Sequence, residues 1–434
     1  MIQGNLLKRK TITREMIEQR SRANNEPQWM LSKRLRSWMI YNESVETKKE
    51  RISFSDVDVE EFLSSEKKNL PKEDFHITNE SRSGGLVFEN AETKEIVLQN
   101  ELKEKGFIVT DLKTVLQQHS SLFEKYFMND CVQITDGKFV SLHSALIDNG
   151  VFVYVPKNVN VTLPIHSHYL LSQTNGAYFP HLVIVCEPQS SLTFLDSYNS
   201  PEVASENESL VSAATELFIG EGARLNYVCL QEFGENVLYR NFKRAMLKKD
   251  ATLSWIEVSL GGKKSHNDVE VYIEESGVSA EIIGIYFAEN EQKMSFNTLQ
   301  KHIAPHCHSN LLFKGVLADK AQTSYEGMIR VHKGAQKTDA YQKNQNILLS
   351  NGSRADSLPE LEIEADDVRC THGATVGPIK ENDLFYLMSR GLSRKEATRL
   401  LTIGFFSEAI DQISVEDVRT EVMSFIEKRM EHVA

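Results

Sequence analysis

The chain has 434 residues, of which 41% are hydrophobic and 25% are charged, and its formal net charge at pH 7 is −12. This length is too great for one ordinary hydrophobic core, so the sequence predicts about two to three domains of a soluble, globular protein. The negative charge argues against a nucleic-acid-binding protein, because such binding depends on neutralising phosphate groups.

The cysteines and the chain start predict a reducing compartment. Five cysteines are scattered along the chain without any CxxC pair, a pattern that does not indicate a disulfide framework. The first residues lack the apolar core of a signal peptide, and no apolar run approaches the roughly 18 residues of a membrane span. We therefore expect a cytoplasmic protein with no membrane partner.

Residues 11 to about 43 show a helical pattern that is interrupted once. The sequence around Pro27 indicates a helix end and a restart, because proline is tolerated in the first turn of a helix. Leu31, Leu35, Trp38 and Met39 then follow at the spacing of one helix face. We expect these four side chains to pack against the rest of the protein.

The next hundred residues carry weaker signals. Residues 44–82 are polar and charged, and we interpret them as a loosely packed connector. Residues 106–112 look like a strand that runs into a helix, with apolar positions continuing to Phe127. We therefore expect a mixed N-terminal region over residues 1–149.

From residue 150 onward, short β-rich runs alternate with turn residues at a nearly constant spacing. Taking the turn residue as an anchor in each run gives steps of 27 to 32 residues along the chain. The anchors are Asn158, Ser190, Gly222, Asp250, Gly277, His306, Gly334 and Asp366. Repeats at a fixed period are typical of stacked arrays, in which each unit buries its inward residues on its neighbours.

The repeat pattern favours a β-solenoid over residues 150–377. A β-sandwich is the alternative, since strands separated by turns fit that fold as well. A sandwich does not require a constant step over eight anchors, however. The sequence thus predicts a mainly β protein whose solenoid core is flanked by helical segments.

Residues 378–434 return to a helical pattern. Asn382 and Asp383 are expected to cap a first helix, and Ser393 with Glu396 forms a capping box for a second helix. A third helix carries one apolar stripe to the chain end: Val415, Val418, Val422, Phe425, Ile426 and Met430. Phe405 and Phe406 are candidate partner-binding anchors, because aromatic residues are enriched at interfaces, although internal packing of both is an equal alternative.

Two histidine clusters are weaker candidates for chemistry. His302, His306, Cys307 and His308 could suggest a metal site, but Pro305 argues against a helix and the segment coincides with a solenoid turn. His166 and His168 lie in a strand-like run. We expect packing or solvated roles for both clusters.

Nucleotide-binding and hydrolase motifs are not found in the sequence. It contains no G-x-x-x-x-G-K-[ST], no G-x-G-x-x-G opening a helix after a strand, and no G-x-S-x-G. We therefore expect that this chain binds no nucleotide and that any nucleotide-driven work is done by another polypeptide.

The strongest candidate site lies in the run Ala-Asp-Asp-Val-Arg-Cys-Thr-His-Gly-Ala-Thr-Val-Gly, residues 365–377. If this run is extended, Cys370 and His372 project from the same face of a strand. A thiolate and an imidazole suit iron in sulfide clusters or zinc. Two ligands do not complete a tetrahedral shell, so the remaining ligands must come from elsewhere in the fold or from a second chain.

The run containing Cys370 closely resembles the signature of the SufB/SufD family of iron–sulfur cluster assembly proteins, in the form typical of SufD. The resemblance extends from about residue 13 to 412 and is most specific over residues 106–164 and 353–410. It implies a right-handed parallel β-helix between two helical segments.

The resemblance also implies a function without enzymatic activity. The chain would be a SufD-like scaffold subunit that pairs, edge to edge, with a SufB-like subunit, while its C-terminal helices hold a SufC-like ABC-type ATPase. Cys370 and His372 match residues associated with a transient iron–sulfur cluster at the subunit interface. A heterodimer within a larger complex is expected, and a homodimer is possible.

A polysaccharide hydrolase or lyase is the alternative function, since such enzymes often use β-helices. It would require carboxylates or cationic side chains clustered along one solenoid face. Asp366 and Asp367 are adjacent in sequence and would alternate between faces, so they do not form such a pair.

Overall fold

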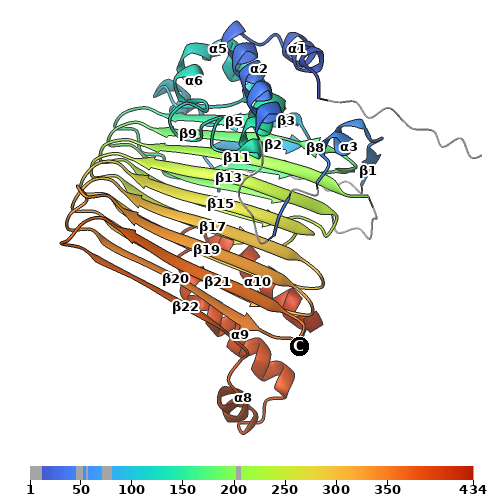
Figure 1. Cartoon of the computed structure of the whole chain (residues 1–434), viewed down its shortest axis with the longest axis vertical. Coiled ribbons are helices and arrows are strands. Elements are labelled where there is room, and N and C mark those ends of the chain that lie inside the picture. The colour runs from blue at the N-terminus through green and yellow to red at the C-terminus, as the bar shows by residue number, and fades with distance from the viewer. Residues whose placement is uncertain (1–11, 45–51, 55–56, 71–80, 202–206, 434) are drawn as a thin grey trace, which may run out of the picture.

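The protein is a β-solenoid with helices before and after it (Figure 1). The computed structural model describes residues 12–44, 52–54, 57–70, 81–201 and 207–433. Successive long strands alternate between two large sheets, so one strand of each sheet and the two turns between them form one coil. The mainly β fold class and the solenoid predicted from the repeat are confirmed.

The first sheet contains ten strands, which end at β22 on one side and at β3 on the other. In spatial order they are β22 (Arg369–Gly377), β20 (Asp339–Leu348), β18 (His308–Leu317), β16 (Ser279–Ala288), β14 (Thr252–Ser259), β12 (Arg224–Glu232), β10 (Ser191–Asn199), β6 (Ile165–Leu170), β2 (Gly84–Glu89) and β3 (Glu92–Leu98).

The second sheet faces the first across the solenoid interior. In spatial order its strands are β21 (Arg354–Ile363), β19 (Gln322–Val331), β17 (Lys293–His302), β15 (Lys264–Ile273), β13 (Val237–Leu247), β11 (Ser209–Ile219), β9 (Pro180–Cys186), β5 (Asn149–Val155) and β4 (Ile108–Asp111), with β8 (Ala177–Tyr178) pairing to β11. A separate small ladder joins β1 (Lys68–Asn69) to β7 (Gln173–Thr174).

Parallel in-register pairing places similar side chains above one another in successive coils. Leu253 of β14 lies between Leu225 of β12 and Ala280 of β16, and all three are buried in the solenoid interior. Because residues two apart in a strand share a face, every second side chain of each strand enters this interior. One continuous apolar core therefore runs along most of the solenoid.

The turns along one edge explain the repeat in the sequence. Asn158, Gly222, Asp250, Gly277 and His306 all have positive φ angles, between 56° and 78°. The amide of each of the first three turns donates to a carbonyl of the next coil, as Gly222 N does to Lys249 O at 2.8 Å. Glycine, asparagine and aspartate adopt this left-handed conformation most readily, which is why they recur at the period of the fold.

Among the described residues, the helices that precede or enter the solenoid are α1 (Arg14–Ala23), α2 (Gln28–Glu43), α3 (Val59–Ser64), α4 (Asn100–Glu104), α5 (Leu112–Gln118), α6 (Ser120–Tyr126) and α7 (Lys138–Leu146). In Figure 1, α1, α2, α5 and α6 lie together at the top of the solenoid. Apolar residues of α2, α5, α6 and α7 pack on the outer face of β5, β9 and β13 in the second sheet.

One sequence prediction for this region needs correction, and one element was not foreseen. Met39 of α2 is 53% exposed, and the fully buried positions of that helix are Met30, Arg34 and Ser37. The buried face includes an arginine because Glu26 pairs with it, and an apolar pattern cannot reveal that. The antiparallel hairpin of β2 and β3 was not predicted either, and it continues the first sheet beyond β6.

Three helices follow the last strand: α8 (Glu381–Met388), α9 (Arg394–Ile410) and α10 (Glu416–Val433). The capping box of Ser393 and Glu396 is present as predicted. The first of these helices begins at Glu381 rather than being capped by Asn382 or Asp383, and its N-cap residue, Lys380, makes no side-chain hydrogen bond.

The helices α9 and α10 cover the outer face of the first sheet. Val418, Val422 and Ile426 of α10 pack with outward apolar side chains from β10 to β18. The apolar stripe predicted for the third helix therefore exists and faces the solenoid. In contrast, α8 projects beyond the last coil at the lower end of Figure 1.

Candidate functional site

Cys370 and His372 lie on β22, the outermost strand of the first sheet. Cys370 is in register with Ala340 of β20, and His372 is in register with Gln342. Both β20 residues are buried and face the solenoid interior. Neighbouring residues in register share a face, so Cys370 and His372 both project inward, at the open end of the solenoid.

The thiol of Cys370 lies in an apolar environment. It packs with Val368 against a small cluster that includes Val331, Ala340 and Ala365. Burial raises the pKa of Cys370, and the negative charge of Asp339 raises it further. Because the thiolate is the form that binds iron, a metal or a positive group from outside would have to favour ionisation.

The interior of the last coil is not covered by any described part of the chain. Leu361 and Ile363 of β21 are in register with the buried Ile329 and Val331, yet they are 37% and 41% exposed. Val376 of β22 is 42% exposed. The edge strands β21 and β22 each have one neighbour in their sheet, so both offer unpaired backbone groups.

Charged side chains form a ladder on the outer face beside this site. Arg369 makes two hydrogen bonds to Asp339, at 2.9 and 2.6 Å, and His308 Nε2 lies 3.1 Å from Glu281. Hydrogen bonding to Arg369 lowers the pKa of Asp339. The ladder fixes β22 against β20 and leaves the inward face to Cys370 and His372.

No group of three or more His, Cys, Asp or Glu side chains in the described ranges is arranged to hold a metal ion. Within these ranges, Cys370 and His372 can supply at most two ligands.

The cluster around His302 is not brought together by the fold. His302 is buried in the interior, where Nε2 lies 2.8 Å from Ser309 Oγ and burial lowers its pKa to about 4. His306 occupies a left-handed turn, and the thiol of Cys307 donates to the carbonyl of Glu275 at 3.3 Å. His308 points to the outer face, so these residues form no common site.

His166 and His168 also have a packing role in the fold. Both rings are buried and bond the same hydroxyl, Ser197 Oγ, at 2.7 and 2.8 Å. Burial lowers the pKa of His168 to about 4. These contacts join β6 to β10.

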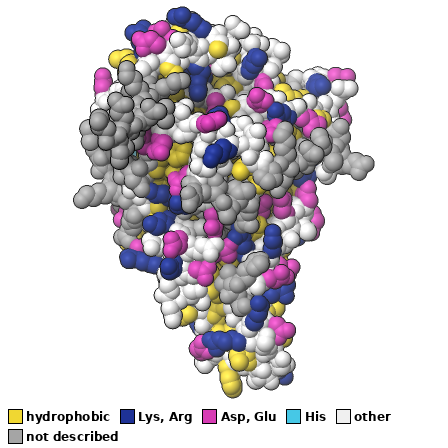
Figure 2. All heavy atoms as spheres, turned by 90° about the vertical axis from the view of Figure 1, so that its right-hand side faces the viewer, with side chains coloured by type: hydrophobic (Ala, Val, Ile, Leu, Met, Phe, Trp, Pro, Cys, Tyr) yellow, Lys and Arg dark blue, Asp and Glu magenta, His cyan; other side chains and the backbone are white. Residues whose placement is uncertain are grey.

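The two candidate anchors of α9 differ in exposure. Phe406 is completely buried against the first sheet, while Phe405 is partly buried with Lys314 Nζ 4.9 Å from its ring centre. On α8, Phe385 is 73% and Tyr386 58% exposed. Figure 2 shows apolar side chains gathered at the lower tip of the molecule, where α8 lies. The partner-binding role of Phe405 and Phe406 stays a prediction.

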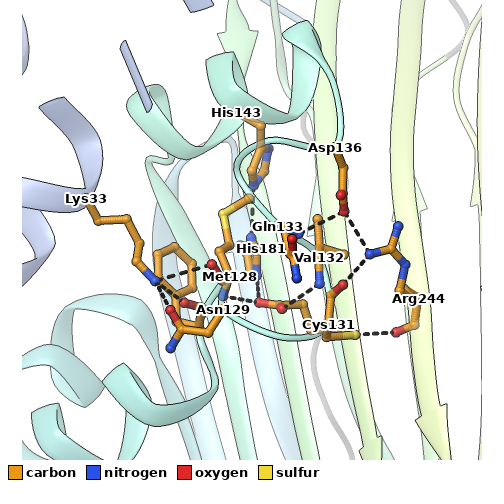
Figure 3. A network of polar contacts seen from close by, with 12 residues as sticks. Lys33, Met128, Asn129, Cys131, Val132, Gln133, Asp136, His143, His181 and Arg244 are labelled. Carbon is orange, nitrogen blue, oxygen red and sulfur yellow. Dashed lines mark hydrogen bonds and ion pairs between the residues drawn. The ribbon is translucent and has the colours of Figure 1, made fainter. Parts of the chain in front are cut away.

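Sequence reasoning missed the buried charged groups. Lys243 Nζ bonds both carboxylate oxygens of Glu257 at 2.8 Å inside the solenoid. Glu216, on the outer face of the second sheet, is completely buried and contacts His181 at 3.0 Å (Figure 3). The feature of the sequence that could have revealed them is a charged residue within an otherwise apolar strand, such as Glu216 within β11 (Ser209–Ile219).

None of the helices over the described ranges is both long enough and apolar enough to span a membrane.

Comparison with known proteins places the fold and the site in a family context. Residues 169–405 match the family model "SUF system FeS cluster assembly, SufBD core domain", and residues 57–166 match "SufBD protein N-terminal region". The chain is 29% identical over 433 residues to the iron–sulfur cluster assembly protein SufD of Bacillus subtilis (strain 168), covering 97% of this chain and 98% of that protein. It is 27% identical over 422 residues to an iron–sulfur cluster assembly SufBD family protein of Staphylococcus aureus (strain MRSA252), covering 93% and 90%.

Proposed function

The chain belongs to the SufBD family of iron–sulfur cluster assembly proteins, and from that premise we propose that it is a SufD-like scaffold subunit whose open solenoid end receives a SufB-like partner. The observation that carries the proposal is the position of Cys370 and His372, which project inward from the uncovered strand β22. The exposed Leu361 and Ile363 would be buried by the partner. Association of apolar surface stabilises such a complex.

In this proposal the nascent iron–sulfur cluster is the cargo. Cys370 would bind iron as a thiolate and His372 through a ring nitrogen, while the partner would complete the ligand set. The raised pKa of Cys370 means that the free thiol is mostly protonated, so iron binding would release a proton. The chain itself would be neither an enzyme nor a nucleotide-binding protein.

The proposal explains the observations better than the polysaccharide hydrolase or lyase alternative, because that alternative rests on fold analogy alone.

The test uses the variants Cys370→Ser and His372→Ala in the purified complex. We expect complex formation to persist, while the iron and acid-labile sulfide recovered with it fall by at least about tenfold, since even residues that only orient a ligand affect metal affinity by about 10–100-fold. Cys307→Ser is a matched control for Cys370→Ser, because it replaces a buried cysteine in an earlier turn of the solenoid. Normal iron and sulfide in both test variants would move the site elsewhere, in the first instance to the partner.

We further propose that α8 and α9 bind an ABC-type ATPase. The exposed Phe385 and Tyr386 offer aromatic anchors that Phe406 cannot offer without unpacking from the sheet. In pull-downs with the ATPase, Phe385→Ala combined with Tyr386→Ala should reduce binding more than Phe405→Ala. Unchanged binding by a chain truncated at residue 380 would exclude the whole C-terminal region.

A further inference from the structure

A buried chain of hydrogen bonds joins the N-terminal helical region to the outer face of the second sheet (Figure 3). It includes His143 of α7, His181 of β9 and Glu216 of β11, all of which are buried. Its other end is the segment 127–137, between α6 and α7, whose backbone covers Glu216. This series of hydrogen bonds lies far from Cys370 in the fold, and the proposed role in cluster assembly does not involve it.

Five contacts make up this chain. His143 Nδ1 lies 2.8 Å from Ser212 O, and His143 Nε2 lies 3.0 Å from His181 Nδ1. His181 Nε2 lies 3.0 Å from Glu216 Oε1. The amides of Met128 and Val132 donate to the two carboxyl oxygens of Glu216, at 2.8 and 3.0 Å.

The direction of each hydrogen bond follows from the acceptor at its far end. A carbonyl oxygen only accepts, so His143 Nδ1 must carry the hydrogen that bonds Ser212 O. Burial lowers the pKa of His143 well below its usual value, so the ring is neutral and its Nε2 is an acceptor. His181 Nδ1 must then donate to it.

The same argument leaves one hydrogen unassigned, at the contact between His181 and Glu216. A neutral His181 that donates through Nδ1 has a lone pair on Nε2, and that lone pair faces Glu216 Oε1 at 3.0 Å. If Glu216 were ionised, a lone pair on its carboxylate would face the lone pair on His181 Nε2 in a buried site. The contact is attractive only if a proton lies between them.

We propose that the native chain holds one proton between His181 and Glu216 at neutral pH, and that this proton locks the segment 127–137 onto the solenoid. With the proton present, every contact from Ser212 to the amides of Met128 and Val132 has one donor and one acceptor. Burial raises the pKa of Glu216 to about 8 and lowers that of His181 to about 3. The proton therefore resides on Glu216.

The two cations near Glu216 bond other groups: Lys33 bonds neutral oxygens and Arg244 bonds carboxylates. Lys33 of α2 bonds the carbonyl of Phe127 at 2.5 Å and Asn129 Oδ1 at 2.7 Å. Arg244 of β13 binds Asp136 and Glu270, each at 2.7 Å. Both cations lower the pKa of Glu216, but burial outweighs them. The buried thiol of Cys131 donates to the carbonyl of Arg244 at 3.1 Å and has a raised pKa, so it is neutral.

The closure of the segment 127–137 onto the solenoid should depend on pH in a defined way. In the opened segment Glu216 has its usual pKa of 4.5, whereas in the closed structure it is about 8. The closed state keeps a proton that the open state loses, so its stabilisation is complete below about pH 4.5 and is lost as the pH rises through 8. The equilibrium constant for opening should rise by up to about tenfold per pH unit within that window.

Infrared spectroscopy of the full chain tests the proton directly. We expect the carbonyl band of a protonated carboxyl group at pH 6.5 that disappears above pH 8 and is absent in Glu216→Gln. Glu187→Gln is the matched control. Glu187 is a less buried carboxylate that accepts a hydrogen bond from the hydroxyl of Tyr126 in α6. Identical spectra for the wild type and Glu216→Gln would show that Glu216 is ionised and would overturn the proposal.

Hydrogen exchange of wild-type peptides covering residues 127–137 gives a second test that needs no variant. After correction for intrinsic exchange, opening should increase by about fiftyfold between pH 6 and 8. Peptides from β14 and β16 should not follow this change. Opening that does not vary with pH would contradict the lock even if the Gln variant fails to fold.

Discussion

The two ends of the solenoid are finished in opposite ways. At the N-terminal end both sheets terminate in an antiparallel strand, β3 in the first sheet and β4 in the second, and helices pack beside them. At the C-terminal end both sheets stop at a parallel strand, β21 or β22, and no further strand of the described residues pairs with it. The chain covers one end of its own core and, over the described residues, leaves the other end uncovered.

The ion pairs at the two ends of the solenoid differ in the same way, in how far they are buried. Near the closed end, Arg34 and Glu26 pair at 2.6 Å with both side chains almost fully buried. At the open end, Arg369 and Asp339 pair at the same distance with side chains that are 78% and 39% exposed. Similar ion pairs therefore have different consequences, because solvent screens the second pair and not the first.

The largest expected effect comes from placing a carboxylate in the interior at each end. Val153→Asp should prevent folding or destabilise the chain by more than about 5 kcal/mol, since Val153 is completely buried in the apolar core, where an isolated carboxylate is very costly. Ile363→Asp should leave the thermal unfolding of the isolated chain nearly unchanged but abolish association with the SufB-like partner. Equal destabilisation by both substitutions would show that the open end is part of a closed core.

The ion pairs give a smaller effect. Arg34→Met should destabilise the chain by about 3–5 kcal/mol, because it leaves Glu26 buried without its partner. Arg369→Met should change the denaturation midpoint very little. Chemical denaturation of both variants at the same pH measures the contrast, and a larger loss for the Arg369 variant would reverse the comparison.

The smallest expected effect concerns the reactivity of Cys370. Its raised pKa makes alkylation slow at pH 7, and the rate should increase with pH as the thiolate forms. Asp339→Asn should accelerate alkylation severalfold at pH 7, because it removes a negative charge that disfavours the thiolate. Mass spectrometry of the peptide that contains Cys370 gives the rate. A slower reaction in the variant would mean that Asp339 acts through the position of β22 rather than through its charge.

The repeat made the solenoid predictable, because a left-handed turn recurs from coil to coil and favours glycine, asparagine or aspartate, although His306 occupies one such turn. The motif around Cys370 likewise identified the strand that carries it. The chain's own covering elements were harder to foresee. The hairpin of β2 and β3 has no counterpart in the repeat, and the buried face of α2 includes Arg34, which looks like a surface residue until Glu26 is seen beside it.

The buried proton site was beyond a prediction from sequence for a different reason. Glu216, His181 and His143 are separated by more than thirty residues from one another, and only the stacking of β9 on β11 brings the first two together. A single charged residue in an apolar strand signals burial but not its partners.

The open edge also affects how the protein must be produced and stored. Two uncovered parallel strands are templates for adding further strands, so the isolated chain is expected to be prone to self-association and aggregation at high concentration. Pro359 interrupts β21 with a residue that has no N–H to donate, and Glu360 and Glu362 add like charges along that strand. These residues should disfavour fibre growth along this edge, and co-expression with the proposed SufB-like partner should increase the yield of dispersed protein.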